Sequence, residues 1–175
     1  HSLNAPVALT NASNVNAETG ATLTIGGDIS GSASLTKTGN GLVALGGANS
    51  YTNTTVNGGT LQIGAGSTTG TLGSGPVTIG TGARLSVNRS DATAITNNIS
   101  GAGTFAQDGA GTTTYSGTAT HTGATDINNG IFINGMPGAR MLRMVVTMLM
   151  DAMMEEIPSM CMAKINRSIP IPTCT

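Results

Sequence analysis

The sequence predicts an all-β protein that folds as a right-handed parallel β-helix, a solenoid, and three observations support this prediction. Glycine supplies 26 of the 175 residues, whereas aromatic residues make up 2% and charged residues 9%, far below the usual charged share of about 25%. Short alternating segments are separated by glycine-rich and asparagine-rich turns. The pattern also recurs along the chain, which is typical of repeat architectures.

The predicted strands are short segments in which apolar and polar positions alternate. They lie at Leu23–Ile25, Leu35–Lys37, Leu61–Ile63, Val77–Ile79 and Leu85–Val87. Alternation of this kind, mostly with Thr or Ser between apolar residues, has the period of a half-buried strand. No segment before residue 136 has the spacing of a helix.

Turns are predicted between these strands, because glycine and asparagine accept a positive φ at little steric cost. They lie at residues 39–41, 57–59, 73–76, 80–82 and 129–130. Short strands joined by such corners are compatible with a sandwich, a barrel or a solenoid.

An internal repeat favours the solenoid. Two copies, at about residues 31–64 and 101–135, align at an offset of 70, and Gly59 aligns with Gly130 after a one-residue insertion. Glycine lies over glycine and apolar over apolar, as expected if each coil stacks on its neighbour. In such a stack Leu, Ile and Val fill the interior, while Thr and Ser cover the outside.

Several segments of the chain resemble the passenger-associated strand repeat of bacterial autotransporters and its linking coils. These segments are residues 35–42, 47–52, 56–64, 72–79 and 88–101. The resemblance extends over about residues 20–133. It implies a β-helical passenger stem that is exported through the outer membrane of a Gram-negative bacterium and displayed at the cell surface.

The resemblance also implies partners. A C-terminal outer-membrane β-barrel translocator is expected to lie outside this chain, which we interpret as an internal piece of a longer protein. Ligands on host cells or neighbouring cells are further expected partners. Nucleic acid is not expected, because seven Lys and Arg against eight Asp and Glu leave a net charge of −1 and no basic face.

The composition divides the chain into two parts. All nine methionines lie within residues 136–162, and both cysteines, Cys161 and Cys174, also follow residue 135. Absence of cysteine before that point agrees with export, since disulfides would hinder threading of an extended chain through a pore. We therefore predict a passenger stem at residues 1–135 and a Met-rich tail at residues 136–175.

The tail has two interpretations. Residues 140–156 are compatible with a short helix that presents Met141, Met144, Val145 and Met148 on one face, either as a groove binder or as a cap on the last coil. The alternative hypothesis is a reading-frame shift near the start of the tail. Translation of the other two frames tests this hypothesis, which fails if neither frame continues the repeat.

The sequence predicts no catalytic, cofactor or metal site. Six Gly-x-Gly motifs lack the third glycine of a dinucleotide loop and are assigned to corners. His121 aligns with Tyr51 and is assigned a structural role rather than that of a catalytic base. The two cysteines are too few, without accompanying histidines, to suggest a metal site.

We therefore predict a structural and adhesive stem and not an enzyme. The alternative is a fragment of a carbohydrate-active β-helix enzyme such as a polysaccharide lyase, which needs clustered carboxylates with Ca²⁺ and a Lys or Arg base. Against this alternative, the aspartates of the stem are scattered along the sequence, at Asp28, Asp91, Asp108 and Asp126.

Overall fold

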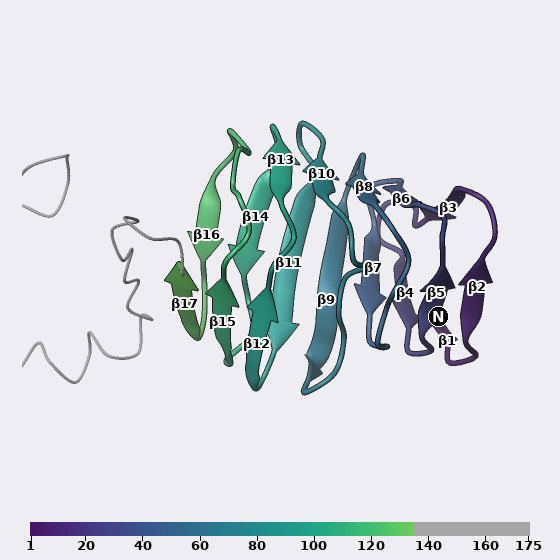
Figure 1. Cartoon of the computed structure of the whole chain (residues 1–175), viewed down its shortest axis with the longest axis horizontal. Coiled ribbons are helices and arrows are strands. Elements are labelled where there is room, and N and C mark those ends of the chain that lie inside the picture. The colour runs from purple at the N-terminus through teal and green to yellow at the C-terminus, as the bar shows by residue number, and fades with distance from the viewer. Residues whose placement is uncertain (135–175) are drawn as a thin grey trace, which may run out of the picture. The chain divides into compact units, whose positions relative to one another are not determined.

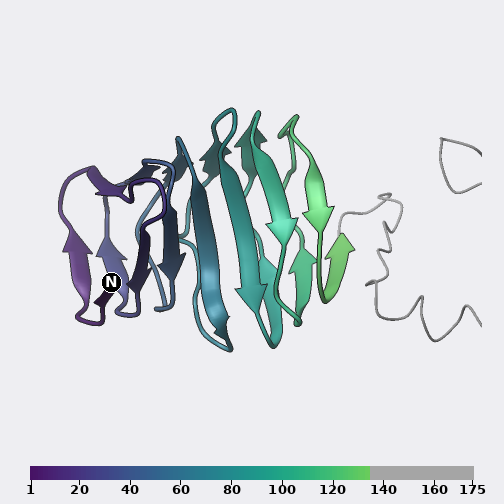
Figure 2. The same cartoon turned by 180° about the vertical axis from the view of Figure 1, so that it is seen from behind.

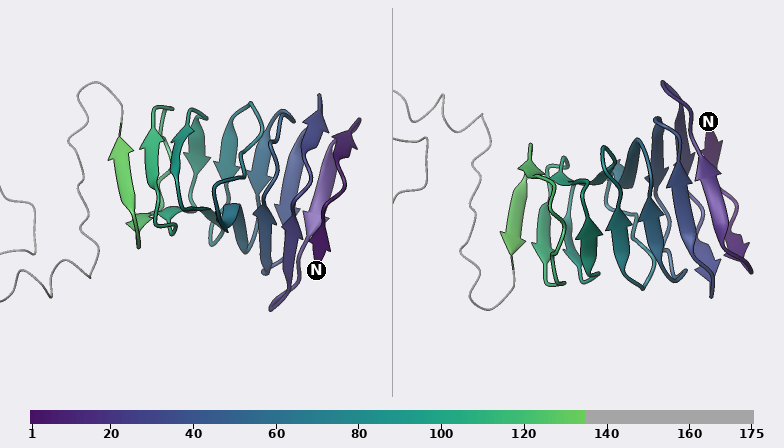
Figure 3. Two further views of the ribbon diagram at one scale, coloured as in Figure 1. Left: turned by 90° about the horizontal axis from the view of Figure 1, so that it is seen from below. Right: turned by 90° about the horizontal axis from the view of Figure 1, so that it is seen from above.

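The computed structural model describes residues 1–134, which form a stack of parallel β coils. This part contains strands and no helix, and its coils make a β-solenoid of about seven turns. Figure 1 shows the strands in chain order along the stack, and Figures 2 and 3 show the same order from other directions. The predicted parallel β-helix is confirmed. Predictions for residues 136–175, including the helix, Cys161 and Cys174, concern residues outside the described part.

The coils place their strands on three faces. Face one carries β1 (Ser2–Leu3), β4 (Thr22–Ile25), β7 (Leu42–Leu45), β9 (Thr60–Ser67), β11 (Arg84–Arg89), β14 (Thr104–Gln107) and β16 (Thr125–Ile127). Face two carries β3 (Ser13–Asn16), β6 (Leu35–Thr38), β8 (Thr54–Val56), β10 (Val77–Ile79) and β13 (Ile99–Gly101). Face three is in two pieces, β2 (Val7–Leu9) with β5 (Ile29–Gly31), and β12 (Ala92–Ile95) with β15 (Thr112–Tyr115) and β17 (Ile131–Asn134). Since residues 1–134 contain no helix, none of this part qualifies as a membrane-spanning helix.

The core is a set of columns in which each inward side chain lies over its register partner in the next coil. On face one the column runs from Val43 through Leu61 and Leu85 to Phe105. All four side chains are buried. Burying an aliphatic side chain of this size stabilises a fold by roughly 1.5–3 kcal/mol, so the columns supply the stability that the few aromatic residues cannot.

The two copies of the repeat lie on different faces. Leu35 begins β6 on face two, whereas the aligned Phe105 lies in β14 on face one. Three coils separate Leu42 from Thr104, a distance of 62 residues in sequence. The offset of 70 residues between the two copies is therefore longer than three coils, by about the length of chain that forms one face. Aligned residues of the two copies therefore lie in different columns, because the repeated unit of strand, corner and strand can begin on either face.

One corner contact recurs in both copies. Gly59 and Gly130 have φ values of 58° and 65°, in the left-handed region that favours glycine. A Cβ atom on Gly59 would overlap the carbonyl oxygen of Gly41, and one on Gly130 would overlap that of Gly111. These glycines are needed both for the turn and for the close approach of the neighbouring coil.

Candidate functional site

Face three is interrupted in the middle of the stack. In coils three and four the chain crosses this face at residues 46–50 and 70–74 without forming a strand. The second crossing lies against the first, because the Thr71 amide donates to the Gly47 carbonyl over 3.1 Å and the Asn49 side-chain Nδ2 donates to the Thr71 carbonyl over 2.7 Å. Consequently β12, in coil five, has a strand neighbour on one side only, β15.

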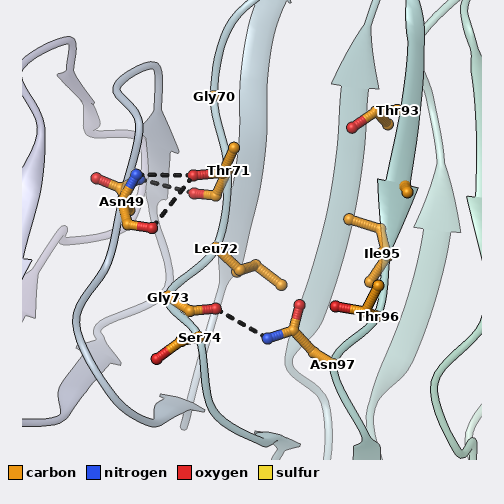
Figure 4. A pocket seen from close by; sticks show the side chains of 11 residues that line it. Asn49, Gly70, Thr71, Leu72, Gly73, Ser74, Thr93, Ile95, Thr96 and Asn97 are labelled. Atoms are coloured by element: carbon orange, nitrogen blue, oxygen red, sulfur yellow. Dashed lines mark hydrogen bonds between the residues drawn. The ribbon is translucent and has the colours of Figure 1, made fainter.

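A cavity of about 240 Å³ lies between residues 70–74 and β12, and we call it the slot (Figure 4). Its floor is apolar, since Leu72 and Ile95 are 5% and 4% exposed and belong to the core; Figure 4 shows Leu72 reaching toward Ile95. Its polar lining comes from Asn49, Thr71, Ser74, Thr93, Thr96 and Asn97. An apolar floor with a few placed polar groups is typical of ligand sites.

Two side chains of coil five connect it to coil four on either side of the slot. Nδ2 of Asn97 donates to the carbonyls of Gly73 and Gly75 over 2.9 and 2.7 Å. Nη1 of Arg89 donates to the carbonyl of Gly70 over 2.7 Å. These bonds take the place of the ladder bonds that a strand in coil four would have made.

Arg89 is held by a paired carboxylate. Its Nε and Nη2 donate to the two oxygens of Asp91 over 2.9 and 2.7 Å. Hydrogen bonding from Arg89 lowers the pKa of Asp91 below its ordinary value, so this carboxylate is ionised at neutral pH. The arginine charge beside the slot is therefore balanced within the chain.

A second hollow, of about 470 Å³, lies on the other side of residues 68–71. Asp28 and Arg89 are its charged lining residues. Asp28 already accepts a hydrogen bond from the Ala48 amide over 2.7 Å. Both charged residues of this second hollow are thus engaged with the chain itself.

Two of the aspartates that are far apart in sequence meet on the outside of face one. Arg84 lies 2.7 Å from Asp108 and 3.7 Å from Asp126. Burial alone would raise the pKa of Asp108, but hydrogen bonds from Ser86 and Asn128 and the charge of Arg84 lower it. The four aspartates are scattered along the sequence, but the stacking of coils six and seven brings two of them, Asp108 and Asp126, together. Within residues 1–134 no three His, Cys, Asp or Glu side chains converge in the manner of a metal site.

His121 occupies the place that Tyr51 has in the first copy. The Tyr51 hydroxyl accepts a hydrogen bond from Thr54 over 3.1 Å, and Nε2 of His121 lies 3.0 Å from the hydroxyl of Thr125. Both threonines begin the strand that follows. The His121 ring packs edge-on against Phe105 with centroids 6.3 Å apart, and its Nδ1 is buried without a hydrogen-bond partner.

This burial predicts that the chain loses stability in mild acid. Burial lowers the pKa of His121 below the ordinary value for histidine, so the unfolded chain takes up a proton at a higher pH than the folded chain. Stability is then complete above the unfolded pKa and falls as the pH drops below it. We expect the urea midpoint to fall between about pH 7.5 and pH 5.5. His121→Tyr should reduce this slope, and an equal slope in both proteins would contradict the prediction.

A lysine lies in the inward column of face two. Lys37 pairs in register with Val56 and is 0% exposed. Its Nζ donates to the carbonyls of Thr38, Gly39 and Gly58 over 3.0, 2.7 and 2.9 Å. Burial lowers the pKa of Lys37 below its ordinary value. The side chain therefore serves the corner between faces two and one, a role that the sequence did not suggest.

Gln107, which aligns with Lys37, serves the equivalent corner in the second copy. Its Nε2 donates to the carbonyls of two corner glycines over 2.8 and 3.2 Å. Its Oε1 accepts a hydrogen bond from the Thr113 hydroxyl over 2.6 Å. In the first copy the residue that aligns with Thr113 is Val43, which has no hydroxyl. Lys37 has no side-chain acceptor and therefore needs no donor at that position. The corner residue and its neighbour thus differ together between the two copies, as Lys37 with Val43 and as Gln107 with Thr113.

These features define the chain as a parallel β-solenoid whose corners are built by a repeated motif. Residues 35–63 and 105–132 match the family of the passenger-associated-transport-repeat. The chain therefore carries two copies of the autotransporter passenger repeat, at the places where we predicted copies. No curated protein and no solved structure matches the chain.

Proposed function

We propose that this chain is a structural and adhesive stem segment of an autotransporter passenger, without catalysis of its own. The observation that supports the proposal most directly is that both passenger repeats, residues 35–63 and 105–132, lie within one continuous solenoid. The repeat implies secretion to the cell surface and a C-terminal translocator. We further propose that this translocator anchors the stem at the outer membrane.

The outer surface of face two supports an adhesive role. Its central column consists of uncharged hydrogen-bonding residues in register, namely Asn14, Thr36, Thr55, Thr78 and Ser100. Side chains of this kind donate and accept hydrogen bonds without the desolvation cost of a charge. Such a column can contact glycans or proteins on another cell.

Adhesion can be tested with beads coated with the full 175-residue chain. We expect coated beads to be retained on epithelial or Gram-negative bacterial layers several-fold more than albumin-coated beads. Thr55→Lys combined with Thr78→Lys should reduce retention, because it places charge on the column and leaves the core unchanged. Gly82→Ala, at a corner, is the control with an unaltered column. Retention equal to that of albumin would refute the adhesive role.

The alternative, a carbohydrate-active enzyme, draws support from one observation. Asp108 and Asp126 converge on Arg84 at the outside of face one, which places two carboxylates beside a basic side chain. Incubation of the chain with polygalacturonate and Ca²⁺ tests this alternative. Release of unsaturated products by the chain, and not by its Asp108→Asn variant, would replace the stem proposal.

A further inference from the structure

The edge of β12 that borders the slot has no strand partner. The amide of Ser116 donates to the carbonyl of Ile95 over 3.0 Å, so Ile95 faces β15. In a parallel ladder the N–H and C=O of one residue point to the same side, and successive residues alternate. Ala92 and Ala94 therefore direct their N–H and C=O groups away from β15, toward coil four, and Ala94 lines the slot. Both residues are exposed.

Several backbone groups on the opposite wall of the slot are already paired with other groups. The amides of Thr71 and Ser74 donate to carbonyls of coil three over 3.1 and 2.8 Å. The carbonyls of Gly70 and Gly73 accept from Arg89 and Asn97. A ligand in the slot would therefore find its backbone partners on β12.

We propose that the slot binds an extended peptide segment, which adds to the free edge of β12 as a further strand. Ala92 and Ala94 offer two N–H and two C=O groups at the period of a strand, and a peptide backbone matches this pattern group for group. Alternate side chains of the peptide would face the apolar floor of Leu72 and Ile95. The methyl side chains of the two alanines are small and leave room for the peptide to approach the edge of β12.

The slot also limits what can bind. Natural proteins protect exposed strand edges, because a long free edge pairs with other chains. Here the bridges from Arg89 to Gly70 and from Asn97 to Gly73 flank the free edge on both sides. The added strand is therefore short, about the length of β12, and a long fibril-forming pairing is disfavoured.

The proposal goes beyond the adhesive stem and needs neither cell display nor a translocator. It can be tested on the purified full chain with an acetylated and amidated Thr-Val-Thr-Val-Thr peptide as the probe. We expect saturable binding, and we expect the amide hydrogens of Ala92 and Ala94 to become protected from exchange by NMR. The amide of Ile95 should change little, because β15 already protects its side of the ladder.

A pair of proline variants locates the binding. Ala94→Pro removes an N–H that faces the slot and leaves the ladder to β15 intact, so affinity should fall about tenfold, the equivalent of roughly 1.4 kcal/mol. Ala8→Pro is the matched control. Ala8 is exposed and lies in the edge strand β2, and because Val7 donates to Asp28 of coil two, Ala8 faces away from its ladder. Its replacement should leave affinity unchanged.

Several outcomes would overturn the proposal. Equal binding by Ala94→Pro and the unaltered chain would do so, as would protection confined to β2 or β17 at the ends of the described stack. Binding of cellopentaose in the slot, with no binding of the peptide, would show a carbohydrate site instead. Failure of peptide binding would not contradict the adhesive role, because the adhesion assay tests the outer column of face two and not the slot.

Discussion

Replacing Gly59 by alanine is expected to lower the free energy of unfolding by about 3 kcal/mol, the sum of two effects. Its φ of 58° lies in the left-handed region, where a Cβ costs roughly 1–2 kcal/mol. The same Cβ would overlap the carbonyl oxygen of Gly41 in the preceding coil. Overpacking of this kind typically adds 1–3 kcal/mol, because a backbone atom in a stacked coil cannot move aside alone.

Gly82 is the matched control for this prediction. Its φ of 75° is similar, but a Cβ there would meet no atom within 4 Å. Gly82→Ala should therefore cost only about 1–2 kcal/mol. Urea unfolding of the full chain measures both variants. Equal losses would mean that the stacking contact with Gly41 contributes nothing.

Replacing Lys37 by methionine should destabilise the chain by about 2–4 kcal/mol, although it removes a buried charge. Methionine has a similar length and fills the space, so no cavity term is expected. The carbonyls of Gly39 and Gly58 would lose the ammonium that now bonds to them. A partly buried acceptor without a partner costs about 1–3 kcal/mol. Equal or greater stability of Lys37→Met would show that desolvation of the lysine outweighs its three hydrogen bonds.

The second copy supplies a sharper test of the same corner. Lys37→Gln alone introduces a side-chain amide oxygen that has no hydrogen-bond donor nearby. In the second copy the amide oxygen of Gln107 accepts a hydrogen bond from the hydroxyl of Thr113. Val43→Thr alone buries a hydroxyl at a position that is 0% exposed. Combining the two recreates the arrangement of the second copy. The double variant should be about 1–2 kcal/mol more stable than the sum of the single losses predicts, and strict additivity would contradict this coupling.

Strands with strong alternation were predictable from sequence. The segments 23–25, 61–63, 77–79 and 85–87 all lie in strands, since apolar residues alternate there with Thr, Ser or Gln. Weakly apolar strands such as β3 and β15 were not recognised, because each is ordered by the coil beside it rather than by its own hydrophobic pattern. Tertiary pairing overrides local propensity in such strands.

The candidate site was not predictable in the same way. Gly73 to Pro76 read correctly as a turn, but the slot beside it exists because residues 70–74 pair with coil three instead of coil five. The local composition of residues 70–74 does not show with which of the two neighbouring coils they pair. The meeting of Asp108 with Asp126 at Arg84 likewise depends on the number of residues in a coil, which only the register reveals.

Local sequence patterns were sufficient to predict the fold class, the repeat and its glycine corners, because hydrophobic alternation and backbone conformational limits act locally. Three properties became visible only once the coils were stacked: the face that each copy occupies, the side chains that serve the corners, and the place where the stack leaves an unpaired edge. These properties depend on the length of each coil. A difference of a few residues between corners turns the next copy to another face, and in coil four it leaves β12 open on one side.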